Sequence, residues 1–326
     1  MSMTSRTFWT FFLGWVAAVG LATTLGGCGG SATESENGGG GGPVVVDGSS
    51  TVFRISKAAQ EQFAKVNDKV EVIVNYSGTG GGFSKYLNNE LDIVDASRPA
   101  KPEEESKAKS QGLDWLKFLV GYDGISVIVN SKNDFVKEMT VEQLARLWKP
   151  ESDVKTWKDL DPSWPDREIK LYSPDDKSGT FEFFTEAIVG KARSQRKNVQ
   201  ASSDDNILVR GVAGDLDAIG YLGYAYYQAN TDKLRVVPIK KTADSPAIEP
   251  NPETILAKTY APLSRPLFIY VKKSSYRRAP VASFVDFYLD KIEELATQAK
   301  YVSPTSEDRA ANKATLDAAK VVTPSA

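Results

Sequence analysis

From Pro43 onward, short apolar runs that suit β-strands alternate with segments whose apolar residues recur every three or four positions, as in amphipathic helices. The first such strand is Val44–Val46, and the first such helix begins near Val52. Strands separated by helices form βαβ units, so we expect an α/β fold with mainly parallel sheets. The roughly 280 residues that follow Pro43 suffice for two domains of ordinary size.

The rest of the chain continues this alternation. Thr140 and Gln143 have the spacing of a capping box, which marks a helix start. The segment 241–263 is rich in proline, alanine and polar residues and reads as a surface connection, and the tail from Thr305 has too weak a periodicity to assign. Further strands are expected at 70–76, 92–96, 118–130, 168–172, 218–221, 234–238 and 266–272, and further helices at 83–91, 101–109, 140–148, 181–189, 203–212 and 281–295.

The first 28 residues have the features of a secretory signal. Arg6 precedes an apolar run from Phe8 to Leu25, and the small residues that follow lead to Cys28. Cys28 is the only cysteine and stands where a bacterial lipobox places the lipidated residue. The alternative is an uncleaved anchor, because the run approaches the ~20 residues that span a bilayer. We favour a lipoprotein held at a membrane in the periplasm or at the cell surface, with residues 29–43, rich in glycine and serine, as a flexible tether.

The composition excludes several classes of function. The chain has no histidine, which removes Ser-His-Asp triads, histidine general bases and histidine-ligated zinc. If Cys28 carries lipid, the mature chain also lacks a thiol that could bind metal. The formal net charge is −2 and no block of like charge suggests nucleic acid as a partner. We expect no metal and no cofactor, and an enzyme would have to use carboxylates, lysine, tyrosine or a cofactor.

Three loops rich in glycine, serine and threonine stand where a predicted strand leads into a helix. They are Gly48–Thr51, Ser77–Gly82 and Ser178–Thr180. A helix N-terminus presents unpaired N–H groups and about half a positive charge, so such loops can hold an oxyanion. Each loop alone is more often only a helix cap, but three of them in one α/β chain favour anion binding. The glycine loop has neither GxGxxG nor Walker A spacing, so a nucleotide site is not indicated.

Arg98 is the residue that we expect to supply the positive charge. It follows the predicted strand 92–96 directly, and the carboxyl edge of a parallel sheet is where ligands bind. Its planar guanidinium suits a tetrahedral oxyanion. The alternative is an ordinary surface arginine.

Several motifs, taken in their order, resemble those of phosphate-binding proteins of the Pst importer. The resemblance covers roughly residues 44–300, and it is the order and number of the motifs that make it specific. The motifs are DGSSTVF at 47–53, SGTGGGF at 77–83, ASRPAKPEE at 96–104, YDGISVIVN at 122–130, TVEQLARLW at 140–148, TWKDL at 156–160, SGTFEFFTEAI at 178–188, and DDNILVRGV with AIGYLGYAYY within 204–227.

The resemblance implies a two-domain type II periplasmic-binding-protein fold whose two crossover hinge strands lie near 122–126 and 259–266. The first domain would comprise 44–123 and 264–326, and the second 124–263. The protein would be a monomer that closes on inorganic phosphate and passes it to the membrane permease of an ABC importer, without catalysis. The residues that would line the phosphate site are Ser50, Thr51, Ser77, Gly78, Thr79, Gly80 and Arg98 on one wall and Ser178, Gly179 and Thr180 on the other.

The chain departs from the better-known branch of this family at two positions. Where that branch has an aspartate that accepts the proton of phosphate, this chain has Arg98, and where it has an arginine before the Ser-Gly-Thr motif, this chain has Pro174. Some branches carry Ser-Arg at the first position, so phosphate remains the expected ligand. Asp123 or Asp47 could replace the missing acceptor, and the sequence leaves the choice open.

Three alternatives to a phosphate receptor remain at this stage. One is a receptor for another tetrahedral oxyanion, such as sulfate, molybdate or arsenate, because a pocket without a proton acceptor discriminates poorly. Another is a histidine-free phosphoester hydrolase with Ser178 or Ser50 as nucleophile. The last is a sensor or surface scaffold that keeps the fold without transport.

Overall fold

The computed structural model describes residues 42–321, which form one compact unit. The expected signal peptide, the lipidation site Cys28 and nearly all of the expected tether lie outside the described residues. Within the described part of the chain, the structure contains no helix that is both long and apolar enough to cross a membrane.

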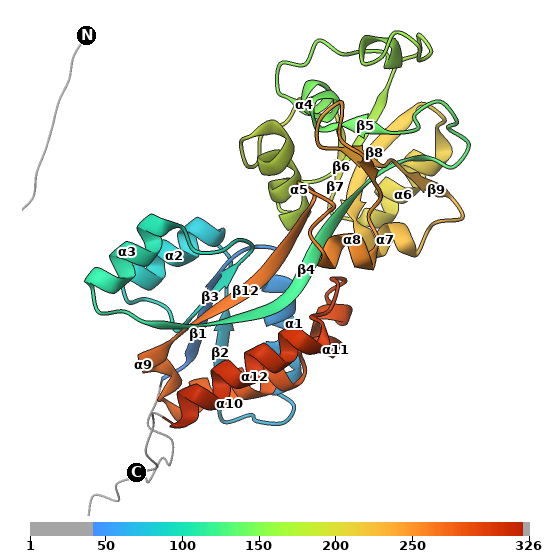
Figure 1. The fold of residues 1–326 in the computed structure, drawn as a ribbon. Helices are drawn as coiled ribbons and strands as arrows, with labels where there is room; N and C mark the ends of the chain where they lie inside the picture. Colours follow the sequence, from blue (N-terminus) through green and yellow to red (C-terminus); the bar gives the residue numbers. More distant parts are fainter. Residues whose placement is uncertain (1–41, 322–326) are drawn as a thin grey trace, which may run out of the picture. The chain divides into compact units, whose positions relative to one another are not determined.

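A nine-stranded sheet forms the centre of the described chain (Figure 1). Its strands follow the order β2-β1-β3-β12-β4-β8-β6-β7, and β9 pairs with β4. The neighbours β2-β1-β3 and β8-β6-β7 are parallel, as expected for βαβ units, whereas the strands between them pair antiparallel. The strands are β1 (Val44–Gly48), β2 (Val72–Val74), β3 (Ile93–Ala96), β4 (Trp115–Asn130), β6 (Lys170–Pro174), β7 (Gln200–Ser202), β8 (Ala218–Gly223), β9 (Leu234–Val236) and β12 (Ser264–Lys272), and a small second sheet contains β5 (Met139–Thr140), β10 (Ile239–Lys240) and β11 (Ala247–Ile248).

The strands β4 and β12 are the two crossover strands. They lie side by side in Figure 1, β4 in green and β12 in orange, and they pair along the whole of β12. Residues 115–124 of β4 pair with β12, and residues 125–130 pair with β8 and β9. One continuous strand therefore belongs to both halves of the sheet. Following the predicted division, we call 42–123 with 264–321 lobe 1 and 124–263 lobe 2, and these boundaries stay a prediction.

Each lobe packs helices on both faces of its half of the sheet. In β12, Leu267 and Ile269 enter one core of lobe 1, whereas Phe268 and Tyr270 enter the other, as the alternation of side chains along a strand requires. The helices are α1 (Phe53–Phe63), α2 (Thr79–Leu87), α3 (Pro102–Ser110), α9 (Lys273–Tyr276), α10 (Ala279–Asp290), α11 (Ile292–Gln298) and α12 (Ser306–Val321) in lobe 1, and α4 (Val141–Trp148), α5 (Gly179–Phe184), α6 (Asp205–Gly214), α7 (Tyr224–Gln228) and α8 (Pro252–Leu256) in lobe 2, with a 3-10 turn at Trp157–Asp159 and a π-helical turn at Thr185–Val189.

The expected elements are present, with differences at their ends, except that the single helix expected at 281–295 is divided at Lys291 into α10 and α11. The capping box is confirmed, because Thr140 Oγ1 accepts from the Gln143 N–H at 3.0 Å and the Gln143 side chain accepts from the Thr140 N–H at 2.9 Å. The helix expected at 83–91 begins at Thr79, since the glycine loop itself forms its first turn. The helix expected at 181–189 is instead α5 followed by the π-helical turn.

Two regions differ more from the sequence prediction. The expected surface connection 241–263 contains α8 and the buried residues Ile255 and Tyr260, and the Tyr260 hydroxyl donates to the Ile125 carbonyl at 2.9 Å. The unassigned tail forms α12, whose Asn312 exchanges two hydrogen bonds with the Leu119 backbone, at 3.0 and 2.7 Å.

Candidate functional site

The three loops singled out from the sequence meet where the two lobes face each other. Ser50, after β1, donates a hydrogen bond of 3.0 Å to Glu182 Oε2 on α5. Gly179 packs so closely on Thr51 that a Cβ at position 179 would lie 2.5 Å from Thr51 Oγ1 and 2.8 Å from its nitrogen. A Cβ at Gly78 would lie 3.4 Å from Glu182 Oε1. Residues of the two predicted walls therefore lie next to each other, although they are more than a hundred positions apart in the chain.

Hydroxyl groups organise the backbone of these loops. Ser178 Oγ accepts from the Thr180 and Phe181 N–H groups, so Ser178 is the N-cap of α5. In the β1–α1 loop, Ser49 Oγ accepts from the N–H of Thr51 at 3.2 Å. The capping function weighed from the sequence is thus present at Ser178. A capping hydroxyl that accepts from the backbone still has its own hydrogen to donate.

A positive charge at the meeting point of the loops comes from Arg265 on β12. Its Nη2 donates to Thr51 Oγ1 at 2.7 Å and its Nη1 donates to Ser97 Oγ at 3.0 Å. The guanidinium carbon lies 3.7 Å from the centroid of the Phe183 ring on α5, and the side chain is 11% exposed. One buried cation therefore contacts lobe 1 and lobe 2 together.

Asp123 lies opposite Arg265 in the register of the two crossover strands. Its Oδ2 accepts from Arg265 Nη2 at 3.3 Å, and its side chain is 2% exposed. Burial raises the pKa of Asp123, and the charge and hydrogen bond of Arg265 oppose that rise. Burial likewise lowers the pKa of Arg265, and Asp123 opposes the change. The pair is a buried carboxylate and guanidinium at the edge of the loops.

Asp47, the other carboxylate left open by the sequence, has different partners. Its Oδ1 accepts from Ser77 Oγ at 2.7 Å, and its Oδ2 accepts from Lys85 Nζ at 2.5 Å. Both oxygens therefore serve to fix the glycine loop and α2 against β1. Asp123, in contrast, shares a donor with Thr51, because both accept from Arg265 Nη2.

The guanidinium of Arg98 pairs with Glu104, a residue of the same lobe. Its Nη1 and Nη2 donate to the two carboxylate oxygens of Glu104, both at 2.8 Å. The Nη1 also donates to the Pro99 carbonyl, and the guanidinium carbon lies 5.6 Å from the Phe83 ring centroid. The hydrogen bond with Glu104 raises the pKa of Arg98. None of these hydrogen-bond acceptors belongs to the predicted ligand set.

The remaining predicted residues lie in the same loops. Thr79 Oγ1 accepts from the Ser97 N–H at 3.1 Å, which ties the start of α2 to the end of β3. A Cβ at Gly80 would meet no atom within 4 Å, so its backbone is openly accessible. Arg265 was missed from the sequence, although its place within the expected crossover segment 259–266 was a usable signal. The role of the predicted set in ligand binding stays a prediction.

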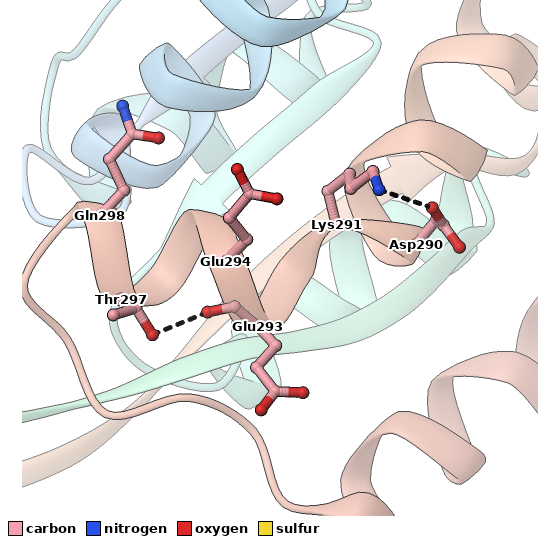
Figure 2. A pocket seen from close by; sticks show the side chains of 6 residues that line it. All are labelled: Asp290, Lys291, Glu293, Glu294, Thr297 and Gln298. Carbon is pink, nitrogen blue, oxygen red and sulfur yellow. Dashed lines mark hydrogen bonds and ion pairs between the residues drawn. The ribbon is translucent and has the colours of Figure 1, made fainter.

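A hollow of about 610 Å³ on α11 is a different kind of site (Figure 2). In Figure 2, Thr297 turns toward the Glu293 backbone, where its hydroxyl donates at 2.8 Å, and Lys291 turns toward Asp290. Its lining includes three carboxylates and one lysine, a balance that does not suit an anion. It is lined by Asp290, Lys291, Glu293, Glu294, Thr297 and Gln298.

An α/β sheet shared by two lobes through two crossover strands, with loops from both lobes in contact, is the two-domain type II fold of periplasmic binding proteins. A family model described as a PBP superfamily domain matches residues 30–291. The chain is 40% identical over 261 residues to Protein SphX of Synechococcus elongatus, covering 79% of this chain and 77% of that protein. It is 38% identical over 301 residues to the phosphate-binding protein PstS of Staphylococcus saprophyticus, covering 92% of each.

Solved structures give the same result. A possible phosphate binding protein from Planctomyces limnophilus is 42% identical, with a TM-score of 0.82 and coverage of 85% of this chain and 98% of that one. A substrate-binding protein from Clostridium perfringens, solved with bound phosphate, is 28% identical, with a TM-score of 0.56 and coverage of 81% and 100%. The chain therefore belongs to the PBP superfamily and, within it, to the family of PstS phosphate-binding proteins.

Proposed function

We propose that this protein captures inorganic phosphate between its lobes outside the cytoplasm and delivers it to the membrane permease of an ABC importer. The observation that carries the proposal is the buried Arg265, which contacts Thr51 of lobe 1 and the Phe183 ring of lobe 2 in a chain whose relatives are phosphate-binding proteins. A guanidinium with the hydroxyls of Thr51 and Ser97 beside it is chemistry that suits a tetrahedral oxyanion.

Arg265 also has a donor that remains to be satisfied. Its Nε is buried and, among the described residues, has no hydrogen-bond partner. An unpaired buried donor costs about 1–3 kcal/mol, so an acceptor at this group would be stabilising. A phosphate oxygen is an acceptor of the right charge. In this proposal Arg265 takes the role that the sequence gave to Arg98.

Asp123 is the proposed acceptor of the phosphate proton. It lies 3.3 Å from Arg265 and is almost fully buried. A buried carboxylate repels an oxyanion that has no proton to donate, so sulfate and molybdate would be disfavoured, whereas arsenate, which also carries a proton, would compete. Competition calorimetry with these anions tests this order, and equal binding of sulfate and phosphate would contradict the role of Asp123.

The test of the function itself is ligand-dependent stability. A ligand that binds only the native state adds RT ln(1 + [L]/Kd), which is about 2.7 kcal/mol at a hundredfold excess over Kd. We expect phosphate at millimolar concentration to raise the melting temperature of protein stripped of ligand, and chloride at equal ionic strength to leave it unchanged. No shift with phosphate would contradict the proposal.

We further propose that the protein is an exported lipoprotein, a monomer and not an enzyme. The support for the anchor is the sequence around Cys28, and the support for a binding role is that the family comprises substrate-binding proteins. Metabolic labelling with palmitate in a lipoprotein-processing bacterium should label the wild type and not Cys28→Ser. In a phosphatase assay, we expect the wild type to show no activity above that of Ser178→Ala.

A further inference from the structure

The hydrogen bond from Ser50 to Glu182 is a direct polar link between the lobes. Ser50 belongs to the β1–α1 loop of lobe 1, and Glu182 lies in the first turn of α5 in lobe 2, at 3.0 Å. The Ser50 hydroxyl has a single hydrogen, and here it is donated to the carboxylate. It is therefore not available at the same time to a phosphate oxygen, although the sequence places Ser50 in the ligand set.

Glu182 is held in this position by residues of its own lobe. Arg193 Nη2 donates to the same carboxylate oxygen, Oε2, at 2.7 Å, and Arg193 Nη1 donates to the Asp176 carbonyl. The Arg193 N–H donates to Thr185 Oγ1 at 2.7 Å, next to α5. The backbone of Arg193 is left-handed, with φ of 59°, a conformation uncommon for a residue with a side chain. Lobe 2 thus presents a fixed carboxylate to lobe 1.

The second oxygen of Glu182 faces the glycine loop. A Cβ at Gly78 would lie 3.4 Å from Glu182 Oε1, an ordinary contact distance, and Gly78 has φ of 80°, so a side chain at this position would be strained. The carboxylate therefore lies against both lobe 1 loops, Gly48–Thr51 and Ser77–Gly82. The carboxylate of Glu182 already accepts from Ser50 and Arg193 through Oε2, so its role here is that of an acceptor for a hydroxyl on the opposite lobe.

We propose that Glu182, positioned by Arg193, is a latch that stabilises the closed form through Ser50 and so sets how slowly phosphate is released. The inference rests on the proposed function for the ligand but concerns lobe closure, which can be measured without it. In this proposal Ser50 helps to hold the lobes together, whereas Thr51 and Arg265 contact the phosphate. Related complexes differ in affinity mainly through the dissociation rate, so a latch should act there.

The kinetic test is stopped-flow release of phosphate from the full-length protein in detergent, comparing the wild type, Glu182→Ala, Ser50→Ala and the double variant. We expect each single variant to release phosphate about tenfold faster with an association rate within about twofold of wild type, as the loss of one hydrogen bond to a charged group predicts. The double variant should be no faster than Glu182→Ala, because both changes remove the same bond. Glu142→Ala, which removes a carboxylate exposed on α4 of the same lobe, is the matched control and should release phosphate like the wild type.

A second measurement tests, without phosphate, whether Glu182 stabilises the closed form. Because Cys28 is the only cysteine and would carry lipid, spin labels can be placed selectively by Lys109→Cys on lobe 1 and Lys191→Cys on lobe 2, both exposed positions. In phosphate-free protein, Glu182→Ala should shift the distance distribution between the labels, and Glu142→Ala should not. An unchanged distribution, an unchanged release rate or multiplicative effects in the double variant would each overturn the latch, whereas a wild type without phosphate binding would instead overturn the proposed function.

Discussion

Replacement of Arg265 by lysine tests which arginine supplies the charge of the site. Lysine keeps a positive charge beside Asp123, so the buried carboxylate is not left unpaired, a loss that typically costs 3–5 kcal/mol. What the change removes is the fork, because one ammonium cannot occupy the places of Nη1 on Ser97 and Nη2 on Thr51. The fold should survive, and the geometry of the site should not.

The expected size of the effect follows from the contacts. A hydrogen bond to a charged group contributes about 1.5–3 kcal/mol, so the loss of one such bond to the anion weakens Kd for phosphate by about 10- to 150-fold. Arg98→Lys is the matched variant, since Arg98 forms its fork with Glu104 and lies partly exposed. A partly exposed ion pair contributes little to stability, and this pair has only an indirect link to the ligand. We therefore expect Arg98→Lys to weaken Kd for phosphate by less than about threefold.

Isothermal titration with phosphate, using both variants stripped of ligand, is the assay, and urea unfolding checks that each variant is folded. The reasoning is refuted if Arg98→Lys weakens phosphate binding more than Arg265→Lys does. That result would restore the assignment made from the sequence. Equal and small effects would show that neither fork contacts the anion.

Three further predictions concern packing and protonation. Gly179→Ala should weaken phosphate binding about tenfold in titration calorimetry, because the new Cβ would enter the Thr51 backbone, whereas Gly214→Ala, with open space around its Cα, should not. Burial raises the pKa of Asp95 well above its usual value, so the wild type loses stability as the pH rises from the unfolded pKa of about 4 through the folded one. Asp95→Asn should therefore gain in melting temperature at pH 8, and the gain should shrink towards pH 4, while the exposed control Asp244→Asn shows no such trend. Thr140→Ala removes a confirmed capping bond and should cost about 1 kcal/mol in urea unfolding, and an unchanged midpoint would contradict that contribution.

The loops of the site could be predicted because their signals are local. Each is a run of small residues between a strand and a helix, and the carboxyl ends of neighbouring parallel strands meet at one edge of a sheet. Thr51, Gly78 and Gly179 could be singled out as candidates in this way without knowledge of the strand register. The structure adds that Gly179 packs directly on Thr51, a contact between the lobes that chain order alone does not give.

The choice between arginines depends on contacts that are not local. Arg98 meets Glu104 because Glu104 occupies the first turn of α3, which turns the carboxylate back toward the end of β3. Arg265 reaches Thr51, 214 positions away, only through the pairing of β12 with β4. From the sequence alone, an arginine can be judged only by the residues near it in the chain. The pairing of the two crossover strands was needed to recognise Arg265.

The tail shows another limit of the sequence pattern. α12 is largely polar, and its burial rests on a few residues such as Leu316 and Ala319. Much of its docking is a hydrogen-bonded contact, in which Asn312 satisfies both polar groups of the Leu119 backbone. Apolar periodicity detects helices that bury a broad stripe, and this helix does not.

The continuity of β4 has a mechanical consequence. Residues 115–124 are hydrogen-bonded to β12 and residues 125–130 to β8 and β9, so any rotation of one lobe against the other bends a strand that is paired on both sides of the bend. Gly124, at the change of partners, has Ile255 against it, where a Cβ would lie 2.4 Å from Ile255 Cδ1. Opening of the lobes would then bend the paired strands β4 and β12 elastically, and the chain would gain little conformational entropy. We therefore expect a restoring force that grows with the angle between the lobes and brings them back together.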